Sequence, residues 1–145
     1  MSSRRRATHV VVDTDAVNWY LDPRPTHTPE SARTLIAGRA CVVSFVTVTE
    51  ITYGALLAGW GGLRLRRLER SLESFDVIPT DEQLMKRCAE LRTWAHRAGH
   101  PLGQKIHEAD RWVAATALVL GLELVAGDGI FEGVPTLDVL RVRPL

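Results

Sequence analysis

The chain has 145 residues, 46% of them hydrophobic, and a formal net charge of +1. This size and composition suit a single domain over residues 1–145 with an ordinary core. No segment approaches the roughly 20 consecutive apolar residues of a membrane span, and the apolar run after the basic start is too short for a secretory signal. The two cysteines, Cys41 and Cys88, form no CxxC pair, so we expect buried, reduced thiols in a cytoplasmic protein without membrane contact.

The first half of the chain alternates short β-branched runs with helical patterns. In chain order we expect a strand over 9–12, a short helix over 16–21, a helix from Thr28-Pro29-Glu30 to Gly38, and a strand over 40–45. Pro23 and Pro25 are expected to end the short helix. Thr47 and Glu50 fit a capping box that starts the next helix, and a further helix over 63–75 completes a helical hairpin.

The second half continues this alternation. We expect a strand over 76–79, a helix opened by a Thr80–Gln83 capping box and closed at Gly99, a loop over 100–103, a helix over 108–120 ended by Gly121, and strands over 123–126 and 136–140. Strands that alternate with helices predict the α/β class: a mostly parallel central sheet flanked by helices, in three α/β/α layers.

Four acidic residues stand where a predicted strand ends or a helix begins, namely Asp13, Glu50, Asp110 and Asp128. In open α/β sheets, functional groups gather beyond the carboxyl ends of the strands. Carboxylates that converge there repel one another and raise each other's pKa values unless a cation neutralises them. Hard divalent cations prefer oxygen ligands, so the pattern predicts a site for Mg²⁺ or Mn²⁺.

Each acid also has a structural explanation, which for Asp13 is that its carboxylate satisfies backbone groups of the turn after the strand. Glu50 fits the capping box with Thr47, Asp110 would interact favourably with a helix dipole, and Asp in a Gly-Asp-Gly sequence such as that at Asp128 is a favoured turn former. Asp15 lies two residues after Asp13 and is expected at most to assist the site.

The basic residues and histidines allow more than one interpretation. Four arginines lie within the helix predicted over 63–75, where they either steer a polyanion or form a solvated helix face: Arg64, Arg66, Arg67 and Arg70. His107 has no second histidine at metal-ligand spacing, His96 and His100 flank a helix end, and we interpret all three as surface or loop residues.

The acidic residues lie in four ordered motifs, which are VVDTD at 11–15, SFVTVTEITYGA at 44–55, DRWVAATAL at 110–118 and LVAGDGIF at 124–131. In these motifs the chain resembles the PIN-domain ribonucleases, and more narrowly the VapC-type toxins of bacterial toxin–antitoxin pairs. The resemblance implies a single PIN-like domain and Mg²⁺- or Mn²⁺-dependent cleavage of RNA phosphodiester bonds.

By position, the resemblance assigns catalysis and metal binding to the acidic quartet Asp13, Glu50, Asp110 and Asp128. We expect Asp13 and Asp110 to bind the metal directly and the other two to complete its coordination, hold water or bind a second ion. The resemblance also implies a small antitoxin partner and a homodimer. The hairpin over 63–75 and the region of Trp60 offer apolar surface for such contacts.

Two alternatives stay open. Asp13-Thr14-Asp15-Ala16-Val17 also fits the DxDx[TV] pattern of haloacid-dehalogenase-like phosphatases, in which Asp13 would be a covalent nucleophile and Asp15 an acid/base. That chemistry needs a lysine near the phosphate, and neither Lys86 nor Lys105 lies at a predicted strand end. The other alternative is a PIN-like binding module without catalysis, although all four acidic positions are filled.

Overall fold

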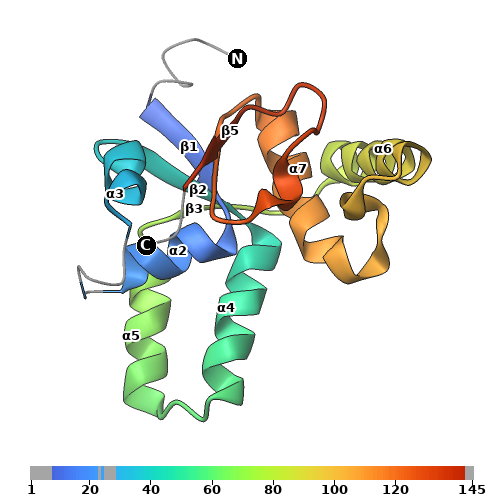
Figure 1. Cartoon of the computed structure of the whole chain (residues 1–145). Coiled ribbons are helices and arrows are strands. Elements are labelled where there is room, and N and C mark those ends of the chain that lie inside the picture. The colour runs from blue at the N-terminus through green and yellow to red at the C-terminus, as the bar shows by residue number, and fades with distance from the viewer. Residues whose placement is uncertain (1–7, 23, 25–28, 143–145) are drawn as a thin grey trace.

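A five-stranded sheet with every pairing parallel forms the centre of the computed structural model, which describes residues 8–22, 24 and 29–142. The strands lie in the order β3-β2-β1-β4-β5 (Figure 1). Their bounds are β1 (His9–Val12), β2 (Ala40–Ser44), β3 (Asp76–Ile78), β4 (Leu124–Ala126) and β5 (Val139–Arg141). The α/β class with a mostly parallel sheet is therefore confirmed.

The middle strand, β1, is buried on both faces. Val10 and Val12 pack into the core on one face of the sheet, and Val11 packs into the core on the other. Val11 lies beside Val42 of β2 and Leu124 of β4, so apolar side chains continue across the strands. Burial on both faces explains why β1 is a run of valines rather than an alternating pattern.

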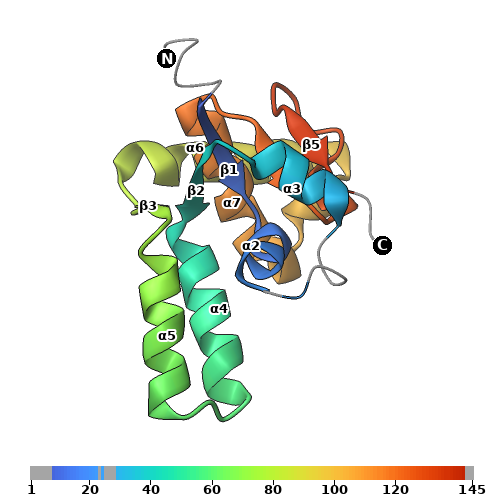
Figure 2. The same cartoon turned by 90° about the vertical axis from the view of Figure 1, so that its left-hand side faces the viewer.

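Within the described residues, six α-helices cover the sheet in two layers (Figures 1 and 2). One layer contains α2 (Thr14–Leu21), α3 (Glu30–Ile36), α4 (Phe45–Leu57) and α5 (Gly62–Leu72). The other layer contains α6 (Glu82–Ala98) and α7 (Glu108–Leu120). Short 3₁₀ turns complete the chain: η2 (Pro101–Gly103) and η3 (Lys105–His107) before α7, and η4 (Gly129–Phe131) after β4.

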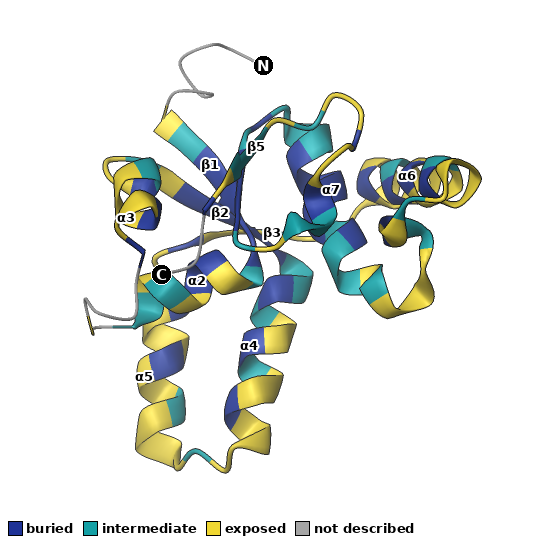
Figure 3. Ribbon diagram, in the orientation of Figure 1, coloured by how far each residue is buried: buried dark blue, intermediate teal, exposed yellow. Residues whose placement is uncertain are grey.

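The hairpin of α4 and α5 extends away from the sheet (Figure 2). Figure 3 shows that its buried residues lie where the helices face each other and the body, while its far end is exposed. Leu56, Leu57 and Leu63 near that end are 59, 73 and 58% exposed, respectively. None of the helices in the described part of the chain combines the length and apolarity that crossing a bilayer requires.

Several predicted boundaries are wrong by a few residues. The last strand begins at Val139 rather than at residue 136, because Thr136 has a positive φ of 63° and Leu137 donates to the Val134 carbonyl in a turn. The α6 cap is Asp81 rather than Thr80, since the Asp81 carboxylate accepts from the Leu84 amide at 2.8 Å. The predictions for Pro23, Pro25 and Thr28 lie outside the described residues. Cys41 and Cys88 are buried free thiols, as expected.

The predicted capping box of α4 is also wrong. Ser44, the last residue of β2, caps the helix, because its hydroxyl accepts from the Val46 amide at 3.3 Å. Thr47 therefore lies inside the first turn, fully buried, and its hydroxyl has no hydrogen-bond partner among the described residues. Glu50 is thereby released from a capping role.

Thr47→Val is expected to raise the free energy of unfolding by about 1 kcal/mol, because it replaces an unpaired buried hydroxyl with a methyl group of similar volume. Urea unfolding monitored by circular dichroism measures the change. Thr47→Ser, which keeps the hydroxyl and loses the methyl group, is the matched control and should be destabilising. A Val variant that is less stable than the parent protein would contradict the assignment of this hydroxyl as unpaired.

Candidate metal centre

Asp13 lies directly after β1 and caps α2. One carboxylate oxygen, Oδ1, accepts from the Ala16 amide at 2.8 Å, and Oδ2 accepts from the Gly127 amide at 3.1 Å. The residue is only 4% exposed. Burial raises the pKa of Asp13 to about 7, with a further contribution from the neighbouring Asp15 charge, although the bonds to backbone amides lower it. The buried carboxyl is thus held in one orientation by two separate elements.

Asp15 begins the exposed side of α2 and lies against the turn that follows β4. A Cβ atom at Gly127 would be 3.1 Å from Asp15 Oδ2 and 2.6 Å from a ring carbon of Trp19, so only glycine permits this approach. Partial burial raises the pKa of Asp15, and the Asp128 charge raises it further. The close approach places the chain after β4 beside the chain after β1.

Glu50 extends from α4 toward the same region. The Thr14 hydroxyl, from the first residue of α2, donates to Glu50 Oε1 at 3.2 Å. Partial burial raises the pKa of Glu50, and the charges of Asp110 and Asp15 raise it further, whereas the Thr14 bond lowers it. A hydroxyl 36 positions away in the sequence therefore orients this carboxylate.

Asp110 lies in the first turn of α7 and contacts His107. His107 Nδ1 is 3.3 Å from Asp110 Oδ2, so His107, which lies near the surface in a short 3₁₀ turn, also contacts a residue of the quartet. Burial raises the pKa of Asp110, as do the charges of Asp128 and Asp15, while the His107 contact lowers it. The His-x-x-Asp spacing at the start of a helix was the available signal for this pair, because residues three apart share a helix face.

Asp128 is exposed, as Glu50 is, and caps η4. Its Oδ1 accepts from the Ile130 amide at 3.0 Å. Its charge raises the pKa values of Asp15 and Asp110, which places Asp128 within electrostatic reach of both. The bond to Ile130 uses one oxygen, which leaves the other free to accept from water or to bind a cation.

The five carboxylates thus form one electrostatically coupled cluster at the carboxyl edge of the sheet. Among the described residues, no lysine or arginine forms an ion pair with any of them. This set of hard oxygen donors, which raise each other's pKa values, fits a divalent cation chemically. No three acidic, histidine or cysteine side chains of the described chain are at ligand distance from one common point, so binding would draw the carboxylates inward or use bridging waters.

Arg111, the residue after Asp110, is buried and anchors the start of α7 to the preceding segment. It is 2% exposed, and its Nη1 donates to the carbonyls of Leu102 and Gln104 at 2.8 and 2.6 Å. These bonds tie the start of α7 to the segment that carries η2 and η3. These bonds consequently fix η3, which carries His107, relative to the first turn of α7, which carries Asp110.

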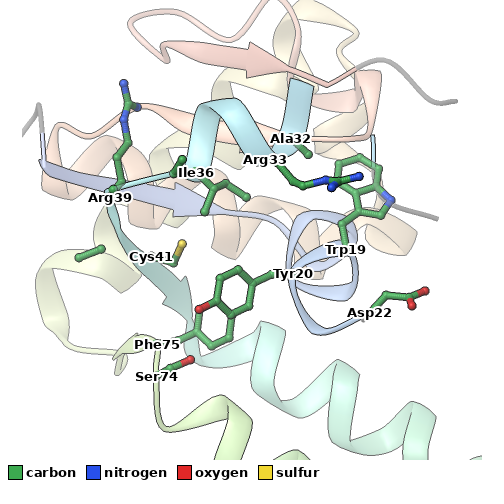
Figure 4. Close-up of a pocket in the computed structure, with 13 residues that line it drawn as sticks. Trp19, Tyr20, Asp22, Ala32, Arg33, Ile36, Arg39, Cys41, Ser74 and Phe75 are labelled. Atoms are coloured by element: carbon green, nitrogen blue, oxygen red, sulfur yellow. The ribbon is translucent and has the colours of Figure 1, made fainter. Parts of the chain in front are cut away.

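A groove and a separate cavity lie in the helix layer that contains α2. A groove of about 790 Å³ starts at Thr14 and Glu50 and follows the α4–α5 hairpin. A separate cavity of about 520 Å³ lies between α2, α3 and β2 (Figure 4), where Tyr20 and Phe75 pack edge to face and Arg33 and Arg39 contribute to the lining. None of the acidic quartet lines this second cavity.

The PIN domain family model matches residues 10–137, and the chain therefore belongs to the PIN-domain family. Ribonuclease VapC1 of Haemophilus influenzae strain R2866 is 27% identical over 118 residues, which cover 79% of this chain and 83% of the relative. The expected resemblance to the PIN-domain, VapC-type proteins is confirmed, and this membership argues against the phosphatase alternative.

Solved structures of VapBC proteins share the fold of this chain. VapBC2 from Rickettsia felis, bound to a promoter DNA fragment, is 18% identical with a TM-score of 0.75, and the match covers 94% of this chain and 100% of the other. DNA-bound VapBC from Salmonella typhimurium is 23% identical with a TM-score of 0.75, and the match covers 92% and 98%. VapBC-1 from nontypeable Haemophilus influenzae is 22% identical with a TM-score of 0.72, and the match covers 92% and 98%.

Proposed function

We propose that this protein is a Mg²⁺- or Mn²⁺-dependent endoribonuclease and the toxin of a toxin–antitoxin pair. The observation that carries the proposal is the cluster of coupled carboxylates without basic partners, at the edge of the sheet of a PIN-domain protein. Its relatives of similar length include proteins named ribonuclease VapC1. The proposal treats residues 1–145 as one PIN-like domain.

We assign Asp13 and Asp110 as direct ligands of the metal, with Glu50 and Asp128 completing its coordination. When bound, the cation supplies Lewis-acid chemistry: it lowers the pKa of a coordinated water and neutralises charge on the phosphate. The amides of Ala16 and Gly127 hold the Asp13 carboxylate in one orientation.

Beyond coordination, three groups of the site position water or a metal ligand. Glu50 is accessible, is oriented by Thr14 and has a raised pKa, which suits it to accept a proton from an attacking water. His107 keeps the Asp110 carboxylate turned in a single direction. Asp128 has one oxygen available for a bound water, since the other accepts from Ile130.

We further propose a small antitoxin, a homodimer and a cytoplasmic location. The solved structures that the chain resembles are toxin–antitoxin complexes, which supports a partner of that kind. The exposed leucines near the end of the α4–α5 hairpin, Leu56, Leu57 and Leu63, offer apolar surface for such contacts.

The test is cleavage of total RNA by the purified chain, freed of any co-purified antitoxin by denaturation and refolding. Discrete products in Mg²⁺ or Mn²⁺ that disappear in EDTA are the expected result. Binding of metal without cleavage of any RNA would indicate a narrow target that total RNA lacks. Absence of both metal binding and cleavage would overturn the proposal and favour the catalytically inactive binding module.

A further inference from the structure

The groove that begins at Glu50 changes character along its length. At the sheet end it is lined by the acidic residue and Thr14, and toward the end of the hairpin by Trp60 and the arginines of α5. From Glu50 to Ala55, the last residue of α4 that lines the groove, the helix advances about 7.5 Å at 1.5 Å per residue, so the groove leads away from the acidic cluster. An anionic chain with one phosphate at the acidic cluster has room to continue along it.

The arginines of the groove differ in how far they are neutralised. Arg24 forms a two-point ion pair with Asp22, in which Nε and Nη2 are both 2.9 Å from the carboxylate. Arg64 and Arg67 are exposed, and neither forms an ion pair with any of the described residues. Two guanidinium groups are thus available for an incoming anion on the wall opposite α4.

Trp60 adds a flat apolar surface beside these charges. The Arg64 guanidinium covers one face of the indole ring, with its carbon 3.6 Å from the ring centroid, so it must turn toward a phosphate before a base can stack on that face. Trp60 is half-buried against the core and lines the groove. A ring face next to arginine is the combination by which proteins hold single-stranded nucleic acid, with bases stacked on the ring and phosphates bound by the guanidinium.

The floor of the groove is open at Gly54 and Ala55. Gly54 and Ala55 present little or no side chain to it, and a Cβ atom at Gly54 would meet nothing within 4 Å. Gly54 lies in the middle of α4, where glycine costs about 1 kcal/mol relative to alanine. The helix therefore bears a stability cost at a position where a side chain would narrow the groove.

We propose that this groove is a binding subsite for single-stranded RNA next to the cleaved phosphate, in which Arg64 and Arg67 bind phosphates and Trp60 stacks a base. The inference rests on the proposed ribonuclease function and adds to it where the substrate lies. The α4–α5 hairpin then forms one wall of the substrate path.

The test compares two double variants with the same change in charge on the same helix. Arg64→Gln/Arg67→Gln removes the groove arginines, and Arg66→Gln/Arg70→Gln removes two arginines of α5 that do not line the groove. Binding of a fluorescently labelled 12-nucleotide RNA of mixed sequence is measured by anisotropy in EDTA, so that no cleavage occurs. The groove variant should bind the RNA roughly tenfold more weakly, and its slope of log binding constant against log salt concentration should be shallower by about 1.4. The affinity of the control variant should change less than about twofold.

Stacking is tested separately at Trp60. Trp60→Leu keeps apolar volume and should weaken RNA binding by at least ~5-fold, whereas Trp60→Phe keeps a ring and should retain most of the affinity. Thermal melts of each variant establish that the comparison is made between folded proteins. Equal affinities for the Leu and Phe variants would overturn the stacking role.

Cleavage of total RNA by the unaltered protein tests the ribonuclease proposal, whereas RNA binding by the two double variants tests the subsite. Equal losses in both double variants, or no loss in either, would overturn the subsite even if the protein cleaves RNA. A selective loss in the groove variant would support the subsite even if no cleavage is found. Unchanged RNA binding together with weaker retention of a co-purified antitoxin would overturn it in favour of a protein-binding groove.

Discussion

Asp110→Asn is expected to lower RNA cleavage about 100- to 1000-fold, because it removes one of the two proposed direct ligands of the metal. The variant should remain folded, since Asp110 is half-buried and its contact with His107 is at the helix surface. It should also lower the pKa of Glu50, because the Asp110 charge contributes to raising it. Initial cleavage rates at saturating Mg²⁺, with melting curves of both proteins, measure the effect.

The matched control is Asp76→Asn, an identical change at an exposed carboxylate on β3, away from the cluster. It should leave cleavage within about twofold of the unaltered protein. If Asp110→Asn retains as much activity as the control, Asp110 is not a ligand and the assignment of the quartet fails. Restoration of the Asp110→Asn rate by a softer ion such as Mn²⁺ would instead support direct ligation, because Mn²⁺ accepts amide and nitrogen donors more readily.

The second large effect is a decline in stability as the pH rises. In the folded protein without metal, the pKa of Asp13 is about 7, whereas the ordinary value is 3.8. Between these two values the folded chain keeps a proton that the unfolded chain has released. Stability therefore falls as the pH rises through this window and is level above and below it, by up to roughly 4 kcal/mol for this group.

Divalent cations should reverse this decline. Burial also raises the pKa values of Asp15, Glu50 and Asp110, so all four groups act in the same direction. A cation binds the deprotonated carboxylates, and added Mg²⁺ should stabilise the fold more at pH 8 than at pH 5. Urea unfolding at pH 5, 6.5 and 8, with EDTA or Mg²⁺, measures both effects.

Asp13→Asn provides the control for the pH effect, because an amide does not titrate. Its stability in EDTA should vary less with pH, and Mg²⁺ should stabilise it less. The amide group will face the Gly127 N–H poorly, so its overall stability is not the diagnostic quantity. A parent protein whose stability rises from pH 5 to pH 8 in EDTA would contradict a raised pKa for Asp13.

The sheet and the positions of the acids follow from sequence patterns because both depend on burial. A short run of valines at 10–12 between polar residues is typical of a doubly buried strand, and the acid after it then lies at the strand end. Asp128 after β4 follows the same rule, and β1 and β4 are neighbours. Parallel topology then brings both acids to one edge.

Local hydrogen bonding was harder to predict. Ser44 and Thr47 are hydroxyl residues one turn apart in a continuous apolar stretch, and only the end of the pairing between β2 and β3 decides which of them caps α4. The Thr14–Glu50 bond joins residues 36 positions apart, and no local pattern encodes it. The His107–Asp110 contact depends on η3, a 3₁₀ turn that was not predicted.

The order of the elements along the chain also determines when the four acids can come together during synthesis. Asp13 and Glu50 belong to the part of the chain that forms β1, β2 and β3, whereas Asp110 follows with α7 and Asp128 follows β4, the strand on the other side of β1. A nascent chain that has not yet released α7 and β4 from the ribosome lacks two of the four carboxylates. The proposed metal site therefore cannot assemble on the ribosome from the first three strands alone.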